Sequence, residues 1–317
     1  MSQHATAANG LAQANQKVIA ICGGWALLAV SCFVAFALFG PGSDWFPLVV
    51  SLLKVGSFLT AAALCWRSSR CPEILSGQLV WQAIAVAMAC YALGDITVIL
   101  WRSLWDITSA VPLGSIFYGM SYLFLAIGLC QAVIPRQMSL NLPQTLGISS
   151  IGLVGVVMAC WLTFQTPAIN ESTSSRVGEI LAISAMQTAE GTSVANTSQK
   201  VPAIVQAVDR RLKPITNRMS LLYVAGDCVL VVMAAALLIA FWGGTYSETW
   251  KLVALAGLCL YVADMFLVYE VGQGSYQQGA FWEIFWILSA ILFGLSAGVE
   301  YGISKRMAAR SDRRQWL

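Results

Sequence analysis

The chain has 317 residues, of which 58% are hydrophobic and only 10% are charged, and its formal net charge is +3. Apolar runs long enough to cross a bilayer recur through most of its length, which excludes a water-soluble globular core. The sequence therefore predicts an all-α, polytopic membrane protein that has the lipid bilayer as a partner.

About eight apolar runs are long enough to form transmembrane helices, because a backbone in lipid has to satisfy its own hydrogen bonds. We place them at residues 18–40, 45–66, 79–101, 111–134, 143–165, 219–242, 250–270 and 280–303. A polar leader, residues 1–17, precedes the first run. We interpret this run as a retained helix and not a signal peptide, since it is long and its leader carries only Lys17.

The distribution of basic residues predicts that the N- and C-termini are both cytoplasmic. In this orientation the short outer loops hold only Arg102. The inner side holds Lys17, Arg67, Arg70, Arg136, Lys251, Lys305, Arg306, Arg310, Arg313 and Arg314. We expect the basic tail, residues 304–317, to contact anionic lipid or a cytoplasmic protein partner, and we expect no nucleic-acid partner.

Two segments of the chain share a spacing. Trp81 precedes Asp95 by fourteen residues, and Trp250 precedes Asp264 by the same distance. The spacing predicts two tandem four-helix repeats, and an even number of spans in each repeat predicts a pseudo-twofold axis along the membrane normal. The predicted units are residues 18–142 and 143–303, the second with an extracytoplasmic insertion at residues 166–218.

Near the end of this insertion, apolar residues at helical spacing stand beside basic residues and before Pro214. They are Val201, Ile204, Val205, Val208 and Leu212. This pattern predicts a helix that lies on the membrane surface, and we interpret the rest of the insertion as a linker.

Ionisable residues inside apolar runs are costly and are candidates for function. In the predicted orientation the outer half of the membrane contains Lys54, Asp95, Asp227, Asp264 and Glu283, and the inner half contains Glu300. We predict that Lys54 pairs with Asp95 or Asp227, and we interpret Glu283 as a residue near the membrane interface. The acids are either interhelical fasteners or the border of a polar pocket for a small ligand or cation; both interpretations stay open.

A tyrosine precedes three of these acids by three or four residues, on the same helical face. The pairs are Tyr91 and Asp95, Tyr223 and Asp227, and Tyr261 and Asp264. Each tyrosine is expected either to hydrogen-bond the acid that follows, to line a cavity with it, or simply to pack. A ridge of small residues on the last run, Gly294, Gly298 and Gly302, predicts close helix packing within the fold or between two copies.

The sequence lacks the residue patterns that metal binding, nucleotide binding and intramembrane proteolysis require. The only histidine is His4, in the polar leader, and no metal-type cysteine spacing or nucleotide-binding loop occurs, so we predict no metal and no cofactor. Gly94-Asp95 and Gly226-Asp227 lack the preceding Gly-x of the intramembrane aspartyl protease motif Gly-x-Gly-Asp. We therefore predict that the protein is not an enzyme.

The second half of the chain has three features in a fixed order: a Tyr-x-x-x-Asp motif, a Trp-to-Asp segment and an aromatic run. The residues that form them are Tyr223, Asp227, Trp250, Asp264, Trp282 and Glu283, and part of the same order occurs earlier at Trp81, Asp95 and Tyr118. This order resembles the uncharacterised multi-span sensor regions that precede diguanylate cyclase or histidine kinase domains in bacteria. The resemblance implies a bacterial inner or thylakoid-like membrane and a signal read on the outer side. No cyclase or kinase module follows Arg314, so signalling is expected to need a partner protein.

These observations favour a non-enzymatic membrane receptor, sensor or scaffold with an outward-facing polar pocket. A proton- or cation-coupled transporter would use the same buried acids. An auxiliary subunit of a larger membrane complex is the third hypothesis.

Overall fold

The computed structural model describes residues 2–39, 45–105, 112–133, 142–165, 202–240, 247–273 and 278–315. Within these ranges the regular structure is entirely helical. The elements are α1 (Ser2–Phe39), α2 (Phe46–Ser69), α3 (Gln78–Trp105), α4 (Pro112–Val133), α5 (Leu142–Gln165), α7 (Ala203–Ala240), α8 (Ser247–Gly272), the short 3-10 helix η1 (Phe281–Glu283) and α9 (Ile284–Gln315).

Six helical segments are long and apolar enough to cross a membrane, namely α1, α2, α3, α4, α8 and η1 with α9. The predicted runs 143–165 and 219–242 fall within α5 and α7, where the apolar stretches are shorter, Thr145–Met158 and Ala225–Ile239. The all-α fold is thus confirmed for the described residues, and the six helices indicate a multi-pass membrane protein. The count of eight spans stays a prediction.

The helices α2, α3, α4, α7, α8 and α9 form a closed ring, in which each packs against the next and α9 packs against α2. One cluster of buried side chains draws on all of these helices, so the ring encloses the main core. Two helices lie outside it. The helix α1 packs on α9 and makes a second core with it and α2, whereas α5 packs on α7 and α8.

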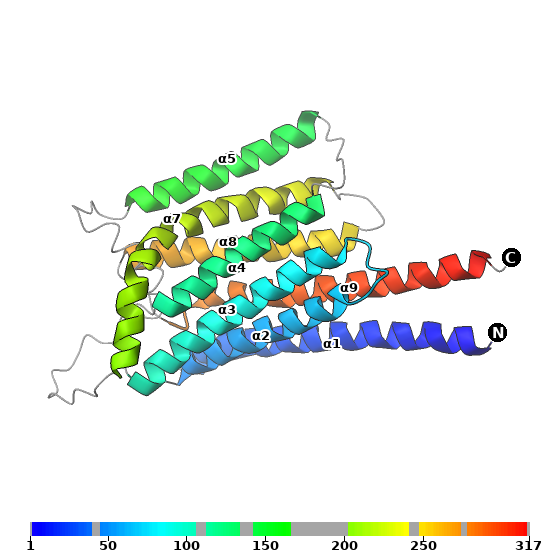
Figure 1. Cartoon of the computed structure of the whole chain (residues 1–317), viewed down its shortest axis with the longest axis horizontal. Helices are drawn as coiled ribbons and strands as arrows, with labels where there is room; N and C mark the ends of the chain where they lie inside the picture. The colour runs from blue at the N-terminus through cyan, green and yellow to red at the C-terminus, as the bar shows by residue number, and fades with distance from the viewer. Residues whose placement is uncertain are drawn as a thin grey trace.

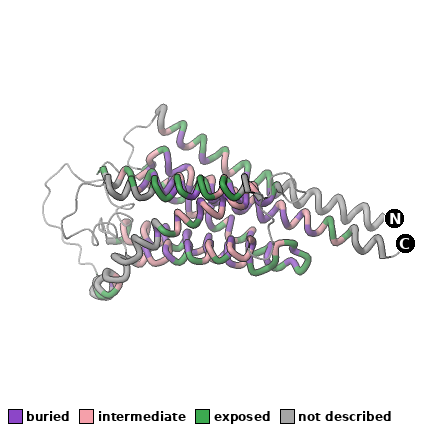
Figure 2. The backbone as a smooth tube through the Cα atoms, turned by 90° about the horizontal axis from the view of Figure 1, so that it is seen from above, coloured by how far each residue is buried: buried purple, intermediate pink, exposed green. Residues whose placement is uncertain are grey.

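The outer surface of the bundle is apolar. Figure 2 shows buried residues on the inward faces of the helices and exposed residues on the outward faces. On α5 the exposed side chains include Leu146, Leu153, Val154, Val157 and Trp161. A surface of this kind, around an interior that holds the charged groups, is suited to lipid and not to water.

Two glycines of the small-residue ridge of α9, Gly294 and Gly298, pack within the fold. A Cβ atom on Gly298 would lie 2.5 Å from Cγ1 of Val18 on α1, and one on Gly294 would lie 3.2 Å from Cα of Ala61 on α2. These glycines therefore let α1 and α2 approach α9 closely.

The predicted helix before Pro214 is present as the first part of α7, which is helical from Ala203 to Ala240. In Figure 1 this first part runs across the long direction of the bundle, and the rest of α7 turns to run along it. The bend is in the half of α7 that contains Pro214, a residue that cannot complete the helical hydrogen-bond ladder. Residues 166–201 of the predicted insertion lie outside the described residues, and the membrane-surface position stays a prediction.

Both termini lie at one end of the bundle (Figure 1). Near that end Glu300 accepts hydrogen bonds from the backbone N–H of Ser76, at 2.8 Å, and from the Ser76 hydroxyl. The ammonium of Lys305 lies 2.5 Å from the carboxylate of Glu73 and, by donating to it, lowers the pKa of that exposed carboxyl. These contacts attach the connection between α2 and α3 to α9.

Candidate functional site

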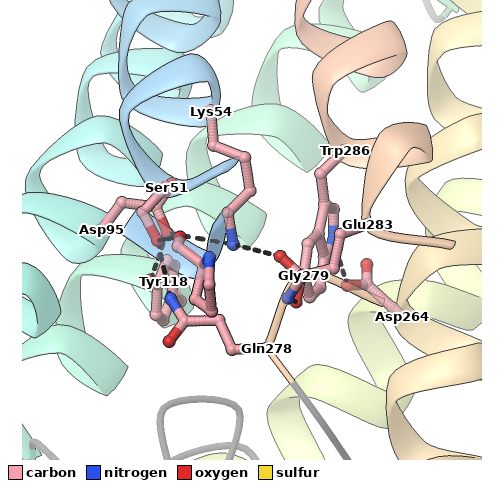
Figure 3. A network of polar contacts seen from close by, with 10 residues as sticks. Ser51, Lys54, Asp95, Tyr118, Asp264, Gln278, Gly279, Glu283 and Trp286 are labelled. Atoms are coloured by element: carbon pink, nitrogen blue, oxygen red, sulfur yellow. Dashed lines mark hydrogen bonds and ion pairs between the residues drawn. The ribbon is translucent and has the colours of Figure 1, made fainter. Parts of the chain in front are cut away.

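The ammonium of Lys54 on α2 lies between two carboxyl groups. Its Nζ is 3.3 Å from Oε2 of Glu283, in η1, and 3.9 Å from Oδ1 of Asp95, on α3. Asp95 also accepts a hydrogen bond from the hydroxyl of Tyr118 on α4, at 2.7 Å. Figure 3 shows these side chains converging from separate helices. The expected contact between Lys54 and Asp95 is present, and Glu283 is a second partner that the sequence did not predict.

Glu283 is fully buried inside the bundle, and its position near the membrane interface stays a prediction. Its Oε1 accepts a hydrogen bond from the backbone N–H of Gly279, at 2.9 Å. Gly279 has a φ of +89°, a conformation that glycine adopts without strain. A reverse turn before η1 therefore folds back over the carboxylate, which leaves its other oxygen directed toward Lys54.

A pair of acids lies on the neighbouring helices α7 and α8. The hydroxyl of Tyr122, on α4, is 2.8 Å from Oδ1 of Asp227 and 2.5 Å from Oδ2 of Asp264. The indole Nε1–H of Trp286, on α9, donates to the other oxygen of Asp264 at 2.9 Å. The acid pair thus lies inside the ring, with its acids on α7 and α8 and its hydrogen-bond partners on α4 and α9.

Trp286 joins the two groups of charges. The Nζ of Lys54 lies 4.5 Å from the centre of its ring, in cation-π contact, while its N–H binds Asp264 (Figure 3). We refer to Lys54, Asp95, Tyr118, Tyr122, Asp227, Asp264, Glu283 and Trp286 as the polar network. Its acids and Lys54 are buried residues, with exposed fractions of 7% for Lys54, 8% for Asp95, 2% for Asp227, 6% for Asp264 and 0% for Glu283.

The tyrosines on the same helices as the acids do not bind them. Tyr223 donates to the carbonyl of Ser115, and Tyr261 donates to the carbonyl of Gly155, at 3.1 Å. The ring of Tyr91 stacks on Phe58, with centres 4.9 Å apart. The expected hydrogen bonds from these residues to the following acids are therefore absent, because the acids point across the ring to aromatic residues of α4 and α9.

The glycines that precede two of the acids have a packing role. A Cβ atom on Gly94 would lie 2.5 Å from the ring of Tyr118, and one on Gly226 would lie 2.6 Å from the ring of Tyr122. Real Cβ atoms do not approach so closely, so only glycine admits these rings. Each Gly-Asp pair thus provides the space for a tyrosine and the carboxyl group that its hydroxyl binds.

The sequence interpretation missed Tyr118, Tyr122 and Trp286 as members of the site. They stand in the aromatic runs that follow each Trp-to-Asp segment, and this position was the available signal. Among the described residues, no three His, Cys, Asp or Glu side chains are grouped so that they could hold a metal ion.

Comparisons with protein-family models, curated proteins and solved structures found no match for the chain.

We expect Lys54→Met to destabilise the protein by about 3–5 kcal/mol, since it leaves Asp95 and Glu283 buried without their ammonium. The charge exchange Lys54→Asp with Asp95→Lys should recover part of that loss. Thermal unfolding of the purified variants measures both effects. An exchange that recovers nothing, with Lys54→Met no worse than a change of a lipid-facing residue such as Leu59→Met, would contradict the pairing.

We expect Gly226→Ala to destabilise the protein by about 1–3 kcal/mol, because its methyl group displaces the ring of Tyr122 from the acid pair. The matched control is Gly257→Ala on α8, where the new Cβ would lie 3.4 Å from the Cβ of Ala234, an ordinary contact. Helix propensity alone favours alanine in both cases. Equal thermal stability of the two variants would show that Gly226 makes no required space.

Proposed function

We propose that the chain is a non-enzymatic membrane receptor of the sensor type, in which α9 conveys a change in the polar network to the basic tail. The observation that carries this proposal is the continuity of α9. Trp286 stands at the start of this helix, directly after η1 with Glu283, and the helix continues to Gln315. With 32 residues it is about 48 Å long at 1.5 Å per residue.

The position of α9 supports this role. Its first residues lie in the half of the bundle away from the termini, and its other end projects with α1 beyond the neighbouring helices (Figure 1). A helix held near its start by an ion pair and a tryptophan, with its last residues projecting beyond the neighbouring helices, can carry a displacement over that length. The tail is then the site for a cytoplasmic protein partner or for anionic lipid.

We also propose that the membrane part has about eight spans in two four-helix repeats. The ring supports this arrangement. Exchanging α2 with α7, α3 with α8 and α4 with α9 maps the contacts of the ring onto themselves. Under this exchange the contact of Tyr118 with Asp95 corresponds to that of Trp286 with Asp264, at 2.7 and 2.9 Å.

The same exchange pairs Lys54 with Asp227, since each lies beside the acid of the next helix in its repeat. One half therefore holds an ammonium and a carboxylate, whereas the other holds two carboxyl groups. With the termini cytoplasmic, the network lies in the outer half of the membrane. A bacterial inner or thylakoid-like membrane is the setting that the sequence resemblance implies.

A proton- or cation-coupled transporter is the second candidate, and the acid pair of Asp227 and Asp264 is the observation that favours it. Buried carboxyl groups in a membrane helix bundle serve as proton or ion carriers in many transporters. The acid pair also lies inside the ring, where the two proposed repeats meet, and transporters built from repeats have their binding sites at such an interface.

The receptor proposal predicts that Lys54→Met and Glu283→Gln change amide hydrogen exchange in residues 305–315 by roughly fivefold or more, the lower end of typical coupling between distant sites. The full chain in lipid nanodiscs is followed by mass spectrometry. The matched control is Ser289→Ala, which removes a buried hydrogen bond of α9 to the carbonyl of Ala256 outside the network. Tail exchange that is the same in all of these proteins would overturn the proposal.

The two candidates differ in a vesicle experiment. For a receptor we expect no change in internal pH when a proton or sodium gradient is imposed across proteoliposomes that contain a trapped pH dye. Flux that depends on the gradient and is abolished by Asp95→Asn and Asp264→Asn would replace the receptor with the transporter.

A further inference from the structure

The hydroxyl of Tyr122 makes two contacts with only one hydrogen atom. It lies 2.8 Å from Asp227 and 2.5 Å from Asp264, both hydrogen-bond distances. A phenol donates one hydrogen bond and accepts others. It can therefore donate to one carboxylate, but its contact with the second carboxyl group needs a hydrogen on that group.

We propose that Asp227 and Asp264 form a proton-binding site, in which a proton on Asp227 is donated to Tyr122 and the Tyr122 hydroxyl donates to ionised Asp264. The distances assign these roles. Separations of 2.5–2.7 Å are typical of an O–H group that binds a carboxylate, whereas about 2.8 Å is usual between neutral groups. Asp264 also accepts the N–H of Trp286 at 2.9 Å, which gives its anion a second donor.

The excess of acids over cations in the network favours a proton on the acid pair. Lys54 supplies one positive charge, and Arg102 on α3 acts on it from further away. Four buried carboxyl groups face this charge: Asp95 and Glu283 beside Lys54, and Asp227 and Asp264 beyond Trp286. Unpaired charges in low dielectric cost several kcal/mol each, so an acid without an ammonium is stable there when it holds a proton.

A further buried group interacts electrostatically with the acid pair. Tyr91, on α3, has an exposed fraction of 5%, and its hydroxyl lies beside Tyr122 and Ser121 without a hydrogen bond of normal length and angle to either. It faces both carboxyl groups. A donor held in reserve beside a titrating pair is suited to stabilise the second carboxylate after the proton leaves.

Titratable and polar side chains from the surrounding helices face the acid pair. They are Tyr91 on α3, Tyr122 on α4, Tyr223 on α7, Tyr261 on α8 and Trp286 at the start of α9. Lys54 of α2 lies behind the Trp286 ring, where it faces Glu283 of η1 and Asp95 of α3. The described side chains of α5 include no titratable group. None of these neighbours is a cation in direct contact with the pair, so a proton is the positive charge that the arrangement takes.

A metal or sodium ion between the same oxygens fits less well. Oxygen atoms 2.5 and 2.8 Å apart are at hydrogen-bonding separations, whereas a cation needs its own metal–oxygen distance of about 2.3–2.6 Å to each ligand, as for calcium. The proton can instead change sides. Asp227 releases it to the Tyr122 oxygen while Tyr122 passes its own to Asp264, which leaves the tyrosine neutral and exchanges the charge of the two acids.

If the chain is a receptor, as proposed above, the proton is the signal that it detects; only this role rests on the proposed function. Loss of the proton places two carboxylates across the contact between α7 and α8, and their repulsion acts on Tyr122 and Trp286, and through Trp286 on α9. The proton-binding site itself stands on the contacts of the acid pair, whatever the tail does.

Infrared spectroscopy of the full chain in nanodiscs tests the site at neutral pH. Aspartate labelled with carbon-13 at the side-chain carboxyl separates its C=O stretch from those of lipid esters and glutamate. We expect a protonated-aspartate band in the wild type that is lost in Asp227→Asn and retained in Asp264→Asn and Asp95→Asn. Size-exclusion chromatography establishes that each variant is folded.

Absence of this band from the wild type, which needs no variant to fold, would overturn the proposal. Persistence of the band in Asp227→Asn would overturn it as well, because the proton would then belong to another acid. The infrared result and the exchange of the tail are separate measurements. If the band is present but tail exchange does not change in the variants, the proton site stands and the receptor proposal is overturned. If tail exchange changes but the band is absent, the receptor proposal stands and the proton site is overturned.

Discussion

The structure depends on the balance of charge inside a medium that does not stabilise charge. Lys54 faces Asp95 and Glu283 at 3.9 and 3.3 Å, and the acid pair of Asp227 and Asp264 lies on the other side of Trp286. An attraction of about 4 kcal/mol at 4 Å, for an effective dielectric constant of about 20, is comparable to the cost of removing each ion from water. The network therefore adds little to stability when complete and destabilises the fold when one member is removed.

This constraint accounts for the packing around the charges. The hydroxyls of Tyr118 and Tyr122 reach the acids only because Gly94 and Gly226 leave room for their rings. The turn at Gly279 directs a backbone N–H onto Glu283, and Trp286 contacts both Lys54 and Asp264. Buried polar groups are thus provided with donors from α4, α9 and the turn before η1, as a low-dielectric interior requires.

The two halves of the ring use equivalent positions for different chemistry. An ammonium on α2 neutralises Asp95 in the first half, whereas on α7 the corresponding residue is a second acid, Asp227. The ring thus has an ion pair on one side and a pair of acids on the other. Trp286, on α9, contacts both sides, and Glu283, in η1 directly before α9, binds Lys54.

The sequence by itself determined the helical fold and the positions of the ionisable residues along the helices, because apolar runs of this length have to form helices in lipid. It also identified Lys54, Asp95, Asp227, Asp264 and Glu283 as members of one group. The tertiary structure alone decided their partners. Glu283 is buried against Lys54, and the tyrosines that bind the acids come from α4 and not from the helices of the acids themselves. Helical periodicity fixes which residues share a face, but the order in which helices close the ring is set by packing between segments far apart in the chain.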